Sequence, residues 1–137
     1  MVLRTLVCVA SNVSRLPYLH EKGELEPMAT NLMLVFSNPA EGKEDAFNAW
    51  YEGTHIPEML GTPGVVAARR YEVAQPEGLP VPPQKYLAVY ELEGDVAQVF
   101  AAIGERGKSG AISAGENTDR ESVVMAVYSP RTDRITG

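Results

Sequence analysis

The chain has 137 residues, and its 12 Lys and Arg against 18 Asp and Glu give a formal net charge of −6. This length suits one domain with a sizeable core, and the acidic balance argues against nucleic acids and anionic membranes as partners. One cysteine, Cys8, excludes an internal disulfide, and two histidines, His20 and His55, argue against a Cys/His zinc site. Because no apolar run approaches the roughly 20 residues of a membrane helix, we expect a cytoplasmic protein.

Residues 1–29 differ in character from the rest of the chain. A short apolar start is followed by a polar stretch with neither helical nor alternating periodicity. One interpretation makes Met28 the natural start, with a loose arm upstream of it. The other makes residues 2–10 an extra edge strand. In either case we expect the chemistry in a domain over 30–130, with 131–137 as a polar tail.

The first predicted elements are a strand over 31–37 and a helix over about 43–55. The helix carries one face of mostly aromatic side chains at positions i, i+3, i+4, i+7 and i+8, namely Phe47, Trp50, Tyr51, Thr54 and His55. Pro57 disfavours helical geometry at Ile56 and cannot continue the helix. We therefore expect the helix to break or kink beside His55.

A second strand is predicted over 65–73, a Pro/Gly-rich loop over 76–83 and a third strand over 85–92. Strict alternation in the second strand separates Arg70 from a face made of Val65, Ala67, Arg69, Tyr71 and Val73. Asp95 begins a capping-box-like segment and a second helix, whose buried stripe is Val96, Val99, Phe100 and Ile103. A loose connection over 104–115 and a fourth strand over 121–128 complete the prediction.

The predicted order is strand, helix, strand, strand, helix, strand. This order is typical of an α+β, ferredoxin-like fold with an antiparallel sheet and both helices on one face. Residues 32–36 and 123–128 are apolar on both strand faces, whereas helices cover only one face. The uncovered face predicts a homodimer with sheets packed face to face. The alternative cover is the N-terminal arm.

His55 is the main candidate for chemistry, because it ends an aromatic helix face that also carries Tyr51. A histidine there acts as a general acid or base near neutral pH, with Tyr51 as a hydrogen-bond donor. The alternative is a buried histidine that bonds a backbone carbonyl. Arg69 is either an anchor for an anion or carbonyl, or half of an ion pair at the sheet edge or dimer interface. Tyr86 and Tyr90 share one strand face and either line a cavity or simply pack.

The segment 48–65, NAWYEGTHIPEMLGTPGV, resembles the segment typical of EthD-like proteins. In those proteins a helix carries Trp or Tyr and then His-x-Pro, and a Pro-Gly turn leads into the second strand. Residues 34–39, LVFSNP, also fit. The resemblance implies membership of the dimeric α/β-barrel superfamily, with a cavity between each subunit's helices and sheet. The family's motif histidine corresponds to His55, and its aromatic neighbours correspond to Trp50 and Tyr51.

The resemblance implies a cofactor-free enzyme that acts on an apolar, aromatic or polyketide-like compound. His55 would move a proton and Tyr51 would position the substrate oxygen, in a lyase or dehydratase, a cyclase or an oxygenase. The residues expected to bind the substrate are Trp50, Phe47, Arg69, Tyr71, Tyr86 and Tyr90. The alternative is a non-catalytic ligand-binding or accessory protein of a catabolic pathway, as for EthD in ether degradation. No dinucleotide fingerprint is present, so we expect no cofactor, and we expect no metal.

Overall fold

The computed structural model describes residues 30–137, so the two interpretations of the N-terminal arm lie outside the described residues. Residues 30–129 form one compact unit, which contains all the helices and strands of the described chain. The tail over 130–137 has neither helix nor strand. No helix in the described part is long and apolar enough to cross a membrane.

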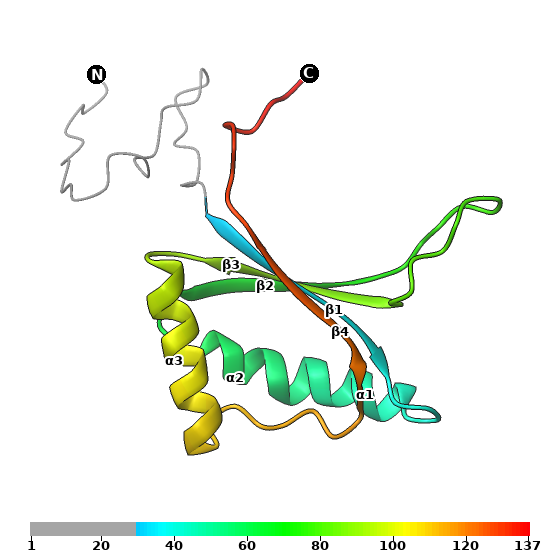
Figure 1. Ribbon diagram of the computed structural model, residues 1–137, viewed down its shortest axis with the longest axis horizontal. Helices are drawn as coiled ribbons and strands as arrows, with labels where there is room; N and C mark the ends of the chain where they lie inside the picture. Colours follow the sequence, from blue (N-terminus) through cyan, green and yellow to red (C-terminus); the bar gives the residue numbers. More distant parts are fainter. Residues whose placement is uncertain (1–29) are drawn as a thin grey trace. The chain divides into compact units, whose positions relative to one another are not determined.

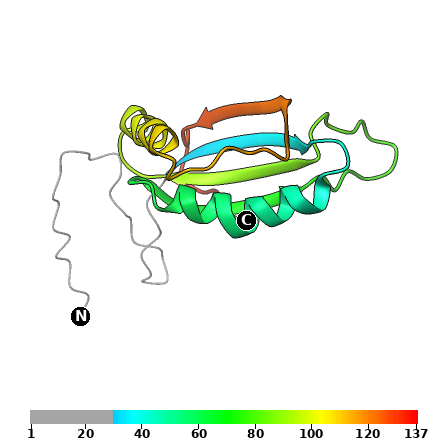
Figure 2. The same cartoon turned by 90° about the horizontal axis from the view of Figure 1, so that it is seen from below.

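The strands form one antiparallel sheet in the order β2-β3-β1-β4. They are β1 (Asn31–Pro39), β2 (Val65–Glu72), β3 (Tyr86–Leu92) and β4 (Thr118–Tyr128). The helical segments are α1 (Glu44–Trp50), η2 (Tyr51–His55), α2 (Ile56–Leu60) and α3 (Val96–Ser109). The first three run on without interruption, and together with α3 they lie on one face of the sheet (Figures 1 and 2). The predicted α+β, ferredoxin-like fold is confirmed.

The core lies between the helices and the sheet. Its largest fully buried side chains are Tyr90, Phe47, Met33 and Leu92. Gly64 allows α3 to pack close to the turn before β2, because its φ is +91° and a Cβ there would collide with Val99. Only glycine readily satisfies both the backbone conformation and the close approach.

The helix continues past His55, so the break that was one of the two predicted outcomes is absent. Residues 51–55 form a π-helical segment, in which the Ile56 N–H donates to the Tyr51 carbonyl. His55 and Ile56 keep ordinary helical dihedrals, with φ of −66° and −60°. Pro57 has no N–H for the carbonyl four residues earlier, and the wider π turn accommodates that loss. The same change of pitch leaves Thr54 exposed rather than on the predicted aromatic face.

The second helix extends further than predicted, to Ser109. Asp95 caps its start by accepting a hydrogen bond from the Gln98 N–H at 3.1 Å, as the sequence indicates. Gly110, with φ of +85°, ends it in the left-handed conformation typical of helix ends. The glycines inside the helix are tolerated because packing against the core outweighs their cost of about 1 kcal/mol each. Arg106 ties the helix to α2 by donating to the Glu58 carbonyl at 2.9 Å.

A β-bulge between Val65 and Ala67 places Val65 on the opposite face of β2 from Arg69, with which it was expected to share a face. Arg70 pairs with Ala88, which is buried against the helices, whereas Arg69 pairs with Val89 on the other side of the sheet. Ala67, Arg69 and Tyr71 share a face as predicted, whereas the prediction was wrong for Val65, which pairs with Leu92 on the other face. One extra residue shifts every later side chain of a strand to the opposite face.

A larger bulge interrupts β4. Phe36 pairs with Val124 and Asn38 pairs with Asp119, so four residues of β4, 120–123, lie opposite the single residue Ser37. Ser122 holds this bulge in place, because its hydroxyl accepts from the Asn38 N–H at 2.8 Å and donates to the Asp119 carbonyl at 2.6 Å.

Candidate functional site

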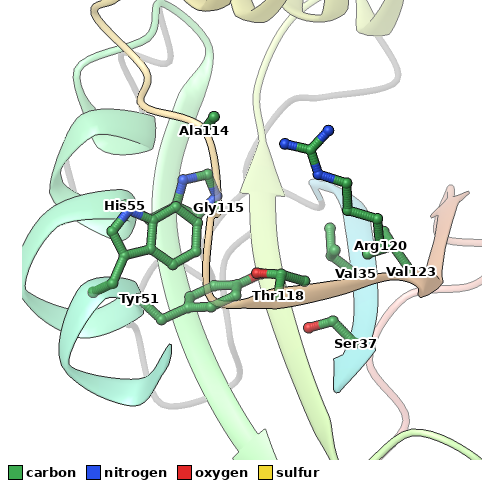
Figure 3. A pocket seen from close by; sticks show the side chains of 10 residues that line it. Val35, Ser37, Tyr51, His55, Ala114, Gly115, Thr118, Arg120 and Val123 are labelled. Carbon is green, nitrogen blue, oxygen red and sulfur yellow. The ribbon is translucent and has the colours of Figure 1, made fainter. Parts of the chain in front are cut away.

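A cavity of about 410 Å³ opens between the helical side of the fold and the β1–β4 side (Figure 3). Its walls are mainly apolar and aromatic, and its volume falls in the range of small-molecule sites. Its lining residues are Val35, Ser37, Trp50, Tyr51, His55, Ala114, Gly115, Thr118, Arg120 and Val123. The described residues contain no group of three His, Cys, Asp or Glu side chains placed to hold a metal ion.

The π-helical segment brings two rings of the site together. Trp50 stacks on His55 with ring centroids 4.5 Å apart and ring planes 22° apart. Residues five apart in an α-helix point about 140° away from each other around the axis. The i to i+5 bonding of a π turn brings such residues nearly into line. Tyr51 meets His55 edge to face at 5.1 Å, so three aromatic rings form one wall.

His55 is suited to accept a proton at neutral pH. Burial lowers its pKa below the usual 6.5, and the nearby Glu58 carboxylate opposes this shift only in part. The imidazole is therefore neutral at pH 7 and available as a base. Its Nδ1 is buried and has no hydrogen-bond partner among the described residues.

Tyr51 remains a protonated hydroxyl in this site. Burial raises its pKa, and the opposing effects of the Tyr90 hydroxyl, the Arg70 charge and the Ser37 hydroxyl are smaller. The Arg70 guanidinium lies 4.5 Å from the centre of the Tyr51 ring. Tyr51 thus offers an O–H donor beside a neutral imidazole.

Glu58 and Ser113 fasten the loop over 110–117 to the helix that carries His55. The two carboxylate oxygens of Glu58 accept from the Ser113 hydroxyl at 2.6 Å and from the Ser113 N–H at 2.7 Å. The Trp50 indole N–H donates to the same hydroxyl at 3.2 Å. Sequence analysis missed both anchoring residues. Glu58 follows His55 by three residues, a spacing that indicates proximity on a helix, but nothing marked Ser113.

Three of the predicted site residues, Trp50, Tyr51 and His55, line the cavity together. Phe47 and Tyr90 are fully buried in the core behind it.

The remaining predicted residues lie elsewhere. Tyr86 donates to Glu44 at 2.8 Å and, with Tyr71, lines a separate polar cavity of about 250 Å³. Arg69 lies on the other side of the sheet, and its neighbour Arg70 lines that second cavity.

No known protein family profile matches the sequence, and no curated protein matches it. Two solved structures share its fold. An EthD family protein of Bacillus halodurans has a TM-score of 0.51 and 17% sequence identity, and covers 75% of this chain and 99% of its own. A "putative monooxygenase" of Shewanella loihica has a TM-score of 0.52 and 18% identity, and covers 79% and 99%. At these identities the likeness establishes the fold, which confirms the EthD-like architecture expected from residues 34–65.

Proposed function

Since the chain has an EthD-like fold, we propose that it is a cofactor-free enzyme that transfers a proton on an apolar, aromatic or polyketide-like compound. The observation that carries this proposal is the neutral imidazole of His55 in the wall of a 410 Å³ aromatic cavity. His55 takes a proton from a carbon or oxygen acid of the substrate. Tyr51 donates a hydrogen bond to the neighbouring substrate oxygen, and Trp50 packs against the substrate's apolar body.

One reaction step, proton abstraction beside a carbonyl or phenol, serves lyase, cyclase and oxygenase chemistry alike. We place the chain in this group without choosing among its members. The names of the two similar structures, an EthD family protein and a "putative monooxygenase", fit this range.

A non-catalytic ligand-binding or accessory role is the second candidate. It is favoured by the lack of any hydrogen-bond partner for His55 Nδ1 within the described chain. Catalytic histidines are usually oriented by such a partner. A binding protein needs only the apolar walls, not an oriented base.

Hydrogen–deuterium exchange on 2-tetralone, an aromatic ketone with acidic protons beside its carbonyl, distinguishes the two candidates. We expect the wild type to catalyse the exchange in D₂O, and His55→Gln to slow it by about 100-fold or more. His20→Gln, at the only other histidine, is the matched control and should leave the rate unchanged. Equal exchange by His55→Gln would refute the role of His55. Binding of 2-tetralone without any exchange would support the accessory role.

We also propose that the chain forms a homodimer through the sheet face opposite the helices. The large apolar side chains on that face include Tyr71, Val124 and Tyr128, which are 46%, 50% and 61% exposed. A second copy would cover them symmetrically. Light scattering should show a dimer for the wild type and a monomer for Val124→Glu. Leu79→Glu, at a similarly exposed loop position, should remain dimeric. A wild-type monomer at micromolar concentration contradicts the proposal.

A further inference from the structure

Arg120 places a positive charge in the wall of the cavity that faces the histidine. Figure 3 shows His55 and Tyr51 on the helix side, and Arg120 with Val123 on the sheet side. The ion pairs of the described residues join Arg70 to Glu52 and Lys85 to Glu44, and none involves Arg120. Arg120 is exposed at the mouth of the apolar cavity and has no protein counter-ion in the described chain.

The bulge of β4 is what brings Arg120 to this position. In a regular strand, residues three apart point to opposite faces, so Arg120 and Val123 would not line the same space. Both do so here, because four residues lie opposite Ser37. The Gln84 side chain adds a bond to the Ser122 carbonyl at 2.9 Å, so the distortion is fastened from the neighbouring loop. Bulges fixed in this way redirect side chains beside functional sites.

The acidic residues nearest to Arg120 in sequence do not line the cavity. Asp119 accepts a hydrogen bond from the Glu121 N–H at 3.2 Å, and neither carboxylate is among the lining groups. Glu58, which is close to His55, has both oxygens bonded to Ser113. The cavity lining thus contains a cation and no anion. Arg is the residue best shaped to pair with a planar carboxylate through two parallel hydrogen bonds.

We propose that Arg120 binds a carboxylate of the ligand, while Trp50 and Val123 contact the ligand's apolar ring system. The ligand class is accordingly an aromatic or polyketide-like acid, bound with its carboxylate toward β4 and its body toward the helix. This inference deepens the proposed function and rests on it, because it requires that the same cavity binds an aromatic compound.

Calorimetric titration with 2-naphthoate and with the neutral, nearly isosteric 2-naphthamide tests the assignment. We expect the wild type to bind 2-naphthoate about 10-fold or more tightly than 2-naphthamide, as a charge-assisted hydrogen bond provides. Arg120→Gln should abolish the preference, because it weakens the binding of 2-naphthoate and not that of 2-naphthamide. Arg120→Lys should retain part of the preference. Lys108→Gln removes one positive charge from α3, outside the cavity lining, and should keep the full preference. Far-ultraviolet circular dichroism checks that each variant is folded.

Different results overturn different parts of the argument. Equal wild-type affinity for the two compounds, or an unchanged preference in Arg120→Gln, refutes the role of Arg120 and leaves the aromatic cavity intact. A loss of preference in Lys108→Gln equal to that in Arg120→Gln would also refute it, because only net charge would then matter. If neither compound binds the wild type, the proposed aromatic ligand and the role of Arg120 both fail.

Discussion

The indole of Trp50 lies nearly parallel to the imidazole of His55, with ring centroids 4.5 Å apart. Trp50 and His55 are five residues apart in the chain, and their rings stack because the helix between them is π-helical. Trp50 is also the only tryptophan of the chain. Its fluorescence therefore reports directly on the protonation of His55 and on the occupancy of the cavity.

The lowered pKa of His55 makes the stability of the protein depend on pH. Because burial holds this pKa below 6.5 in the folded state, the unfolded chain binds the proton more readily. The free energy of unfolding should therefore fall as the pH drops below about 6.5, until the folded pKa is passed. Urea unfolding followed by Trp50 fluorescence, at about pH 8 and about pH 5, measures the change. His55→Gln should show a smaller change than the wild type, and an equal change would contradict the prediction.

Gly115 keeps the cavity open where the loop passes the tryptophan. A Cβ at this position would lie 2.9 Å from Cη2 of Trp50 and 2.8 Å from Oγ1 of Thr118, so the indole must move. We expect Gly115→Ala to shift the Trp50 emission and to weaken 2-naphthoate binding by about 10-fold, which corresponds to roughly 1.4 kcal/mol. Gly104→Ala is the control, since a Cβ there meets no atom within 4 Å. It should raise stability by about 0.5–1 kcal/mol and leave binding unchanged.

The guanidinium of Arg70 lies over three aromatic rings and is the structurally important member of the Arg69–Arg70 pair. It is 4.5 Å from the ring centre of Tyr51, 4.9 Å from that of Tyr86 and 5.4 Å from that of Phe47. Thermal unfolding should show a loss of about 1–3 kcal/mol for Arg70→Gln. Arg69→Gln, on the other side of the sheet, should stay within about 0.5 kcal/mol of the wild type. The reverse ranking would contradict the place of Arg70 on the helix side of the sheet.

The hydroxyl of Tyr90 is buried beside that of Tyr51 and makes no well-formed hydrogen bond within the described residues. Because a poorly satisfied buried hydroxyl costs free energy, Tyr90→Phe should be as stable as the wild type or more stable, by up to about 1 kcal/mol. Tyr90→Ala should lose about 3–5 kcal/mol, as large-to-small core changes do. Denaturant melts of both variants measure the difference. A marked loss in Tyr90→Phe would show that the hydroxyl is in fact bonded.

The order of elements and the sheet topology could be predicted from the sequence, because alternation, helical periodicity and the Asp95 cap are local signals. The clustering of Trp50, Tyr51 and His55 could also be predicted, since all three lie on one short helical stretch. The stacking of their rings could not be predicted, because a π turn depends on how Pro57 and the packed rings are accommodated together. The helix length near Ser109 was missed because Gly104 favours a loop when its packing is unknown.

The faces of β2 and the positions around β4 could not be predicted, for one physical reason. A bulge is decided by pairing between strands that are distant in sequence, and a single unpaired residue reverses the alternation that the prediction relies on. Arg69 was therefore predicted as the substrate-binding arginine, whereas Arg70 is the one that lies on the helix side of the sheet. Arg120 and Ser113 were not considered, since the place of Arg120 is set by the bulge opposite Ser37 and that of Ser113 by its bonds to Glu58.

The bulge in β4 also bears on how the protein avoids aggregation. Among the described strands, β4 lies at an edge of the sheet and carries exposed Val124, Met125 and Val127, so its outer side is a template for pairing with a foreign chain. Four residues opposite one interrupt the regular spacing of donors and acceptors at 120–123. An incoming strand can therefore form regular backbone hydrogen bonds only with the last five residues of β4. The bulge that places Arg120 at the cavity thus also disfavours edge-to-edge polymerisation.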